Sequence, residues 1–437
     1  MKVGFVSLGC SKNLVDTEKT IDIFKKHGYD IVNNPKEAEI IVINTCGFIE
    51  TAKEEAINTI LEMAEYKKEN CKYIIAMGCL VQRYREELEK SLPEVDLFIK
   101  YDEYDTIWSQ IDNLINKDII HEKEEDIPFN KLQDRVITTG DNFAYVKIAD
   151  GCNNCCTFCA IPYIRGRFES RPMEDIIEEV KKLAKSGYKE IILIAQDTTK
   201  YGIDIYGKPK LAELLKKLCK IDGIKWIRFL YAYPETIDDK LIKVVKKNEK
   251  ICKYFDIPIQ HISDSVLKRM NRKSNSESIE LLIKKLREKI PNVIIRTTVM
   301  VGFPGETQED FEKLCNFVES AKFDKLGAFA YSKEEGTPAA KLKEQVHPMT
   351  KKARYNKIME IQQKVSEENL NKYIGKQLEV LVEGKTIDGK YYVCRSYMDV
   401  PDIDGLIYFN NSKELKIGDF VKCTIKSSIN EYDLLGE

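Results

Sequence analysis

The chain has 437 residues, of which 43% are hydrophobic and 32% are charged, and its formal net charge at pH 7 is −2. This composition is typical of a folded globular protein of about two to four domains, and it excludes an intrinsically disordered chain. The 69 Lys and Arg against 71 Asp and Glu leave no global positive field that would drive non-specific nucleic-acid binding.

The N-terminus carries no signal-like apolar segment, and no run of about 18 apolar residues occurs in the sequence. We therefore expect a cytoplasmic protein with no membrane partner. Thiols stay reduced in that compartment, so the 13 cysteines are expected to serve as metal ligands or catalysts rather than in disulfides.

The first 125 residues alternate short apolar runs with helical patterns, which indicates a parallel sheet covered by helices. We predict strands within 2–8, 39–45 and 72–78 and helices over 17–28, 52–68 and 101–117. The polar stretch 121–135 predicts a linker. Residues 1–125 are therefore expected to form an α/β domain.

A second alternating series predicts a domain over residues 138–370. Its strands are expected within 143–150, 190–196, 226–232, 254–260, 292–302 and 326–331. Six successive strand–helix units favour a partial (β/α) barrel over an open doubly wound sheet. A long helix over 349–372 then leads to five short strands, which predict a small OB-like β-barrel over 371–437.

Three cysteines, Cys10, Cys46 and Cys79, each follow a predicted strand of the first domain. The carboxyl ends of parallel strands meet at one edge, so the three thiols can converge there. Each also precedes a helix, whose N-terminus is expected to lower the pKa of the thiol. Burial as small apolar side chains is the alternative for any one of them. Three thiolates favour an iron–sulfur cluster, with zinc left open.

Residues 151–159, "GCNNCCTFC", place four cysteines after the first strand of the second domain: Cys152, Cys155, Cys156 and Cys159. Two touching C-x-x-C pairs could indicate zinc, but such sites normally separate their pairs by a loop. Adjacent side chains of an extended segment point in opposite directions, so Cys155 or Cys156 is expected to be a bystander. If it is Cys155, the spacing is C-x3-C-x2-C with Phe158 in the last gap. That spacing is the signature of radical S-adenosylmethionine (SAM) enzymes.

Polar residues and glycine also follow later strands of the second domain and are candidates for holding a cofactor or substrate: Gln196, Asp197, Tyr231, Tyr233, Gln260, His261, Gly302 and Glu306. Ordinary strand-to-helix turn chemistry is the alternative for each of them. His261 could equally be a satisfied turn residue.

With "GCSKNLVDTE", "NTCGFIETAKEEAI", "DIPIQHISDSVLKRMNR" and "RSYMDVPDIDG" in view, the whole chain resembles the radical SAM methylthiotransferases. The resemblance implies a radical SAM barrel and a C-terminal TRAM module. It also implies two 4Fe-4S clusters, an auxiliary one on Cys10, Cys46 and Cys79 and a SAM-cleaving one on Cys152, Cys156 and Cys159. Three ligands leave one iron free to chelate SAM. Further cofactor-binding residues are predicted to be Phe158, Gln196, Gly302 and Glu306.

The branch that the chain resembles most adds a methylthio group to the β-carbon of an aspartate in the twelfth small-subunit ribosomal protein. The implied partners are that protein, held through the TRAM module, and an electron-donating reductant. One SAM would give the methyl group and a second would generate a 5'-deoxyadenosyl radical. The auxiliary cluster would bind the sulfur.

Two other functions stay open at this point. MiaB-type relatives modify an adenosine of tRNA, but residues 371–437 carry nine Lys or Arg against eleven Asp or Glu. That balance favours a basic protein partner over RNA. A non-enzymatic iron–sulfur carrier or redox sensor is the alternative of another class, although a carrier has no need of a barrel.

Overall fold

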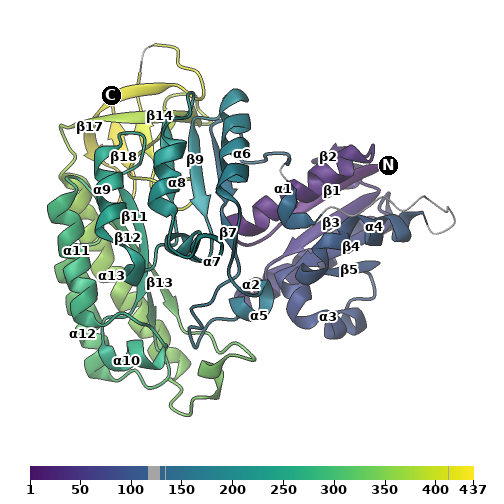
Figure 1. The fold of residues 1–437 in the computed structure, drawn as a ribbon, viewed down its shortest axis with the longest axis horizontal. Helices are drawn as coiled ribbons and strands as arrows, with labels where there is room; N and C mark the ends of the chain where they lie inside the picture. Colours follow the sequence, from purple (N-terminus) through teal and green to yellow (C-terminus); the bar gives the residue numbers. More distant parts are fainter. Residues whose placement is uncertain (117–127, 133, 412) are drawn as a thin grey trace.

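The computed structural model describes residues 1–116, 128–132, 134–411 and 413–437. Three units follow one another along the chain: an N-terminal α/β unit, a central unit of strands and helices, and a small C-terminal barrel (Figure 1). This confirms the predicted mixed α/β fold class. The predicted linker at 121–135 lies largely outside the described residues, and the predicted domain boundaries stay a prediction.

The N-terminal unit is a five-stranded parallel sheet in the order β2-β1-β3-β4-β5. Its strands are β1 (Lys2–Ser7), β2 (Asp30–Val32), β3 (Ile40–Thr45), β4 (Tyr73–Gly78) and β5 (Leu97–Lys100). Its helices are α1 (Ser11–Lys26), α2 (Glu50–Ala64), α3 (Cys79–Ser91) and α4 (Ile107–Ile115), with 3-10 turns η1 (Pro35–Glu37), η2 (Glu65–Lys68), η3 (Tyr101–Thr106) and η4 (Phe129–Lys131). The three predicted strands are confirmed, whereas β2 and β5 were too short to predict.

Two helices of this unit differ from the sequence prediction. The helix expected over 101–117 begins as the 3-10 segment η3, and its α-helical part is only Ile107–Ile115. Helix α1 begins at Ser11, six residues before the predicted start. The charged start of α1 has the polar pattern of a loop, but most of it is buried in the fold.

The central unit contains the six predicted strands in sequence order. These are β6 (Phe143–Lys147), β9 (Glu190–Ile194), β10 (Trp226–Phe229), β11 (Tyr254–Gln260), β12 (Ile294–Val301) and β13 (Lys325–Ala330). They form two three-stranded parallel sheets, β10-β9-β6 and β11-β12-β13. An isolated bridge between Ile227 and Ile251 and a backbone hydrogen bond from the Ala232 N–H to the Asp256 carbonyl at 2.8 Å link the two sheets. The strand series therefore forms an open barrel in which β10 and β11 share no regular ladder and are joined by a few backbone hydrogen bonds.

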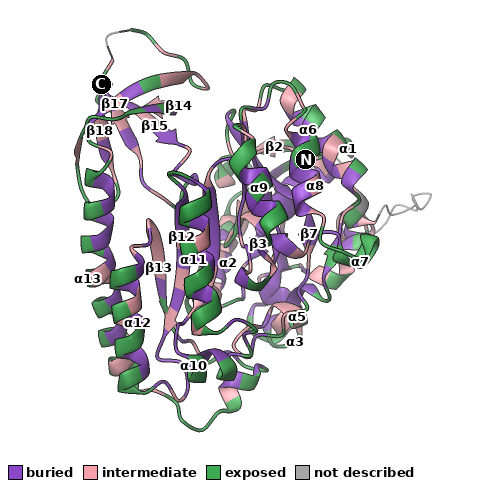
Figure 2. Cartoon of the chain, turned by 60° about the vertical axis from the view of Figure 1, so that its left-hand side comes forward, coloured by how far each residue is buried: buried purple, intermediate pink, exposed green. Residues whose placement is uncertain are grey.

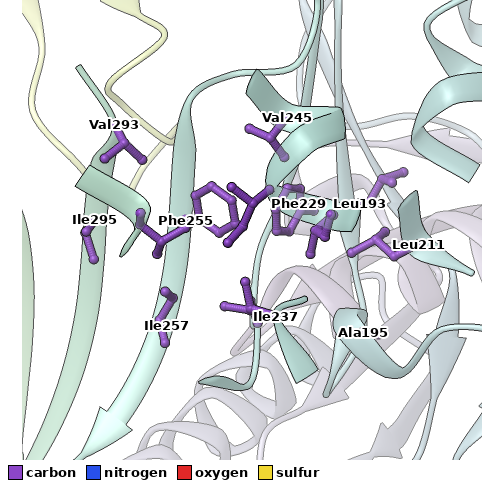
Figure 3. Packing of buried hydrophobic residues seen from close by; sticks show 14 of the residues in the cluster. Leu193, Ala195, Leu211, Phe229, Ile237, Val245, Phe255, Ile257, Val293 and Ile295 are labelled. Carbon is purple, nitrogen blue, oxygen red and sulfur yellow. The ribbon is translucent and has the colours of Figure 1, made fainter. Parts of the chain in front are cut away.

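Apolar packing also joins the two sheets on the face that the helices cover. Phe229 on β10 and Phe255 on β11 meet edge to face with ring centroids 5.4 Å apart, and both are fully buried (Figure 3). Burial of a Phe side chain stabilises a fold by about 1.5–3 kcal/mol. The two sheets therefore share one core and hold their carboxyl ends in a fixed arrangement.

Helices cover the outer face of the strands (Figure 1). Helix α6 shows why they form, since Ile176, Val180 and Leu183 recur at helical spacing and are all buried. The helices are α5 (Ile161–Arg165), α6 (Met173–Lys185), α7 (Ile203–Tyr206), α8 (Leu211–Leu218), α9 (Asp239–Lys247), α10 (Asp264–Arg269), α11 (Ser276–Lys289), α12 (Gln308–Ala321) and α13 (Pro348–Asn371). The short elements are β7 (Ala149–Asp150), β8 (Glu169–Ser170), η5 (Thr198–Lys200), η6 (Pro234–Thr236) and η7 (Pro338–Lys341).

The C-terminal unit is a closed five-stranded barrel in the order β14-β15-β16-β18-β17, which confirms the prediction. Its strands are β14 (Gln377–Lys385), β15 (Tyr392–Ser396), β16 (Ile407–Phe409), β17 (Phe420–Ser428) and β18 (Leu434–Gly436). None of the helices described here has the length and apolar character needed to span a bilayer.

Buried ion pairs join the three units. Asp16 on α1 pairs with Lys147 on β6, and Arg395 of the C-terminal barrel pairs with Glu190 on β9 at 2.7 Å. The Asp16, Glu190 and Arg395 side chains have no exposed surface, and Figure 2 shows buried residues concentrated on the inward faces of the elements. Removing one partner of such a pair strands a buried charge. The geometry of these pairs therefore fixes how the units are placed around the site.

Candidate active site

One cavity of ≈ 620 Å³ is lined by residues from all three units. The lining includes the six cysteines predicted as ligands: Cys10, Cys46, Cys79, Cys152, Cys156 and Cys159. The C-terminal barrel adds Val400 and Ile403 from the loop after β15. The fold therefore gathers both predicted cysteine trios around one space.

The first trio, Cys10, Cys46 and Cys79, comes from three chain segments that two glycines bring together. A Cβ on Gly9, whose φ is +86°, would lie 2.7 Å from the Cβ of Cys46. A Cβ on Gly47 would lie 2.6 Å from the Cα of Leu80, the residue after Cys79. Only glycine permits these approaches, because any side chain there would push the strand ends apart.

Within the first trio only Cys10 has a lowered thiol pKa, and nearby side-chain charges lower it more than the backbone at the start of α1 does. Burial alone would raise the pKa of Cys10, but the charges of Lys12 and Arg165 outweigh it and the pKa is lowered. Burial raises the pKa of Cys46 and raises that of Cys79 to about 12. The prediction of a lowered pKa was wrong for these two, because burial penalises the thiolate more than the Phe48 backbone N–H favours it at Cys46, and more than the Arg165 charge favours it at Cys79.

The second trio, Cys152, Cys156 and Cys159, lies in the loop between β7 and α5. The backbone N–H of Cys159 donates to the carbonyl of Cys156 at 3.0 Å, and the Tyr233 hydroxyl lies 3.4 Å from the Cys156 Sγ. Burial raises the pKa of Cys152 and raises that of Cys159 to about 12.

Cys155 is turned away from the cavity by its backbone. Its φ is +51°, its side chain is exposed, and it is absent from the cavity lining. Asn271 fixes this bend by donating to the Cys155 carbonyl at 2.9 Å. The segment is therefore not extended at Cys155, and this bend, rather than the alternation of an extended strand, leaves Cys155 outside the cavity while Cys156 lines it.

Five of the other sequence candidates line the cavity: Phe158, Gln196, Tyr231, Tyr233 and Gln260. The Gln196 amide donates to Asp150 at 3.0 Å, and its buried Oε1 has no hydrogen-bond partner among the described residues. A buried acceptor or donor without a partner costs free energy, so an unpaired amide oxygen in a cavity is suited to meet a ligand.

Gly302, Glu306, His261 and Asp197 are absent from the cavity lining. The Glu306 carboxylate accepts the Phe303 N–H at 2.9 Å and lies 3.2 Å from Arg354 on α13. Burial raises the pKa of Glu306 to about 7. Gly302 packs against Lys351 of the same helix. The contacts of Gly302 and Glu306 join the end of β12 to α13, and those of Asp197 cap η5.

A network of charged residues that the sequence did not reveal stands between the trios. Arg165 on α5 lies 2.9 Å from both Asp16 and Asp150 and donates to Asn13 at 2.6 Å. Asn13 in turn accepts from the Cys79 thiol at 3.4 Å. The network locks α1 and α3, which follow two of the strand ends, onto the loop that carries the second trio.

The donor sets fit iron–sulfur clusters. Each trio offers three thiols on a cavity with free space, and soft thiolates are the usual ligands of such clusters. Within the described residues no three His, Cys, Asp or Glu side chains are arranged to hold a single metal ion. A cluster binds each thiolate through a different iron, so its ligands stand farther apart than those of one ion.

Three family models match successive parts of the chain. One described as the radical SAM superfamily matches residues 146–318, and one described as uncharacterized protein family UPF0004 matches residues 2–100. A TRAM domain model matches residues 374–437. The three matches fall, in this order, on the central unit, the N-terminal sheet and the C-terminal barrel, and the first of them ends before β13 and α13.

Curated relatives match over the full length. "Ribosomal protein uS12 methylthiotransferase RimO" of Alkaliphilus oremlandii is 61% identical over 438 residues, which cover 100% of this chain and 99% of that protein. The chain belongs to the RimO family. RimO proteins of Thermoanaerobacter sp. and Lachnoclostridium phytofermentans are 52% and 50% identical, each with 100% of this chain and 99% of their own length covered. RimO family membership and the radical SAM model imply SAM and two 4Fe-4S clusters as cofactors, in agreement with the sequence.

Solved structures share the fold at low identity. The radical SAM methyltransferase TsrM of Kitasatospora setae aligns with a TM-score of 0.58 at 12% identity over 77% of this chain and 76% of that chain. The cobalamin-dependent SAM radical enzyme OxsB aligns with a TM-score of 0.51 at 13% identity, over 83% of this chain and 56% of its own. These likenesses concern the fold alone.

Proposed function

We propose that this protein is a radical SAM methylthiotransferase that replaces a β-hydrogen of an aspartate in ribosomal protein uS12 with a methylthio group. The single observation that carries the proposal is the placement of two cysteine trios from two units on one cavity. The printed name of relatives up to 61% identical supplies the substrate. A non-enzymatic iron–sulfur carrier needs only one cluster site and does not require two cysteine trios on one cavity.

We assign the auxiliary cluster to Cys10, Cys46 and Cys79 and the SAM-cleaving cluster to Cys152, Cys156 and Cys159. Lining of the cavity supports the six assignments, and the outward turn of Cys155 supports its exclusion. When bound, SAM and the clusters would supply the radical, the methyl group and a binding place for the incoming sulfur, while the protein supplies position and exclusion of water.

Side chains around the second trio are placed to orient SAM. We propose that Phe158 packs against SAM and that the free Oε1 of Gln196 accepts a hydrogen bond from it. For Gly302 and Glu306, also predicted as cofactor contacts, the pairing of Glu306 with Arg354 supports a structural role instead. The Tyr233 hydroxyl lies close to the Cys156 Sγ. The guanidinium of Arg272 stacks on the Tyr233 ring, with its Cζ 4.3 Å from the ring centroid.

The C-terminal barrel is proposed to hold uS12. Its residues Val400 and Ile403 reach the cavity wall, so a protein bound to this barrel would lie beside the reacting groups. Residues 371–437 carry nine Lys or Arg against eleven Asp or Glu, which suits a basic protein better than RNA. An electron-donating reductant is the other partner required, and the cytoplasm, where ribosomes assemble, is the proposed location.

The test is a substrate comparison with reconstituted protein under anaerobic conditions. We expect incubation with SAM, a reductant and uS12 to add the mass of a methylthio group at one aspartate, and tRNA to stay unmodified. Modified tRNA with untouched uS12 would replace the proposal by the tRNA function. Absence of 5'-deoxyadenosine from protein with intact clusters would remove the enzymatic interpretation altogether.

A further inference from the structure

Lys12, on the first turn of α1, is a buried cation that faces the cavity without a carboxylate. Its side chain lines the cavity, and only 6% of the residue is exposed. Its ammonium stands over the ring of Tyr231, 3.6 Å from the centroid. In the part of the chain that the structure describes, this ammonium has no hydrogen bond and no ion pair. The Cys10 thiol is a second electrostatic neighbour, but neither the thiol nor the ring face accepts a hydrogen bond from this ammonium, so its donors are left for another partner.

The other two cations on the cavity wall differ from Lys12 in having acidic partners. Arg165 pairs with Asp16 and Asp150, each at 2.9 Å. Arg296 pairs with Asp256 at 2.9 Å. The Asp256 carboxylate is therefore already paired with Arg296. Among the cavity-lining cations of the described residues, Lys12 is therefore the one without an ion pair to a carboxylate.

Lys12 also connects the N-terminal part of the site with the central part. It follows Cys10 of the first trio by two residues, yet its ammonium contacts Tyr231, in the strand-end loop of the central unit. The same loop carries Tyr233, whose hydroxyl lies 3.4 Å from the Cys156 Sγ. An anion held by Lys12 would thus be within the space that the two trios share.

We propose that Lys12 is the receptor for a carboxylate, and that this carboxylate is the side chain of the substrate aspartate. The inference rests on the proposed function, in which the β-carbon of that aspartate must be reached from both trios. Its carboxylate is bonded to that carbon, so a cation between the trios is placed to orient the reacting residue. A charge-assisted hydrogen bond in a buried site is among the strongest polar contacts available.

The experiment is a double-substitution cycle on binding. The dissociation constant of uS12 is measured for the anaerobic holoenzyme and its Lys12→Met variant, with uS12 carrying either the natural aspartate or asparagine at the modified position. We expect Lys12→Met to weaken binding of natural uS12 roughly 10- to 100-fold and binding of the asparagine form by less than about 3-fold. Lys12→Arg, which keeps the charge, should restore most of the affinity.

Lys19→Met is the matched control. Lys19 lies on the same helix, is buried to 4% exposure and donates to the Phe129 carbonyl at 2.9 Å, away from the cavity. It should leave uS12 affinity unchanged. Equal losses for the aspartate and asparagine forms would overturn the proposal, because the interaction would then not involve the carboxylate.

Two further measurements distinguish other anions. A weaker dissociation constant for SAM in Lys12→Met, with no coupling to the substrate aspartate, would assign Lys12 to the carboxylate of SAM and overturn the proposal. An altered auxiliary-cluster electron paramagnetic resonance (EPR) signal with unchanged uS12 affinity would assign it to the cluster. Failure of the proposed function itself is distinguishable, since wild-type protein would then not modify uS12.

Discussion

The two cysteine trios reach the same cavity by different routes. Cys10, Cys46 and Cys79 lie at the ends of three strands, and only the assembled sheet brings them together. Cys152, Cys156 and Cys159 lie in one loop, where the backbone bend at Cys155 sets their directions. The first trio therefore depends on tertiary structure and on packing between units, whereas the second depends on local conformation.

The network of charged residues around Arg165, which forms the junction between the N-terminal and central units, also supports the first trio rather than the second. Asn13, which accepts from the Cys79 thiol, is held by Arg165 from the central unit. The bend that excludes Cys155 is held by Asn271, which belongs to the same unit as the loop. Loosening the junction between units should disturb the first trio before the second.

The largest effect is expected inside the loop. Cys156→Ala should abolish SAM cleavage and reduce the iron content from about eight to about four per chain, because one of three ligands is lost. Cys155→Ala should keep both, since its side chain is exposed and outside the cavity. Iron analysis and 5'-deoxyadenosine release measure the two variants. The reverse pattern would show that Cys155 is the ligand.

A ligand of the first trio should separate the two clusters in function. Cys79→Ala is expected to abolish methylthio transfer and to leave substrate-free SAM cleavage within about 3-fold of wild type, because the second trio does not need it. Mass spectra of uS12 and 5'-deoxyadenosine release are the measurements. If this variant has a normal unfolding midpoint but no longer cleaves SAM, the claim that the second trio functions without the first would be wrong.

Breaking the junction should act mainly on the first trio. Asp16→Asn leaves the buried cations Lys147 and Arg165 short of a carboxylate and is expected to destabilise the protein by roughly 3–5 kcal/mol. Urea unfolding measures the loss, and iron should be released first from the auxiliary cluster. Asp22→Ala, on the same helix, removes an i,i+4 pair with the exposed Lys26 and should cost less than about 1 kcal/mol.

The smallest effect concerns His261, which lies near the same strand edge but outside the cavity. Burial lowers its pKa to about 4, with Asp310 opposing and Arg354 assisting. The unfolded chain, with an ordinary histidine pKa, binds the proton first, so stability falls as the pH drops below about 6.5. Between pH 7.5 and 5.5, wild type should lose roughly 1 kcal/mol more than His261→Asn. Equal losses would show that His261 is not buried in its neutral form.

The strand-end cysteines could be predicted because parallel strands share a carboxyl edge, which places Cys10, Cys46 and Cys79 together without knowledge of their contacts. The same argument was insufficient for Glu306. The strand order predicted that Glu306 lies at the carboxyl edge of the strands, but it did not predict the direction of its side chain. Arg354 on α13 pairs with Glu306, which does not line the cavity.

The buried charges of α1 could not be predicted from "SKNLVDTE". Its polar and charged residues have the pattern of an exposed segment, whereas Asp16 is fully buried against Lys147 and Arg165. Their partners lie more than a hundred residues later, and nothing in the spacing reveals the pairing. Burial at the junction between units also explains why the thiol pKa values of Cys46 and Cys79 rise rather than fall.

The most direct test of the central claim is the EPR spectrum of the doubly reduced protein. If the two trios hold two clusters on one cavity of ≈ 620 Å³, the two spins are close and should couple. The wild-type spectrum should then be broader than the sum of the spectra of two variants, each with one trio replaced by alanine. A wild-type spectrum equal to that sum would contradict a shared cavity.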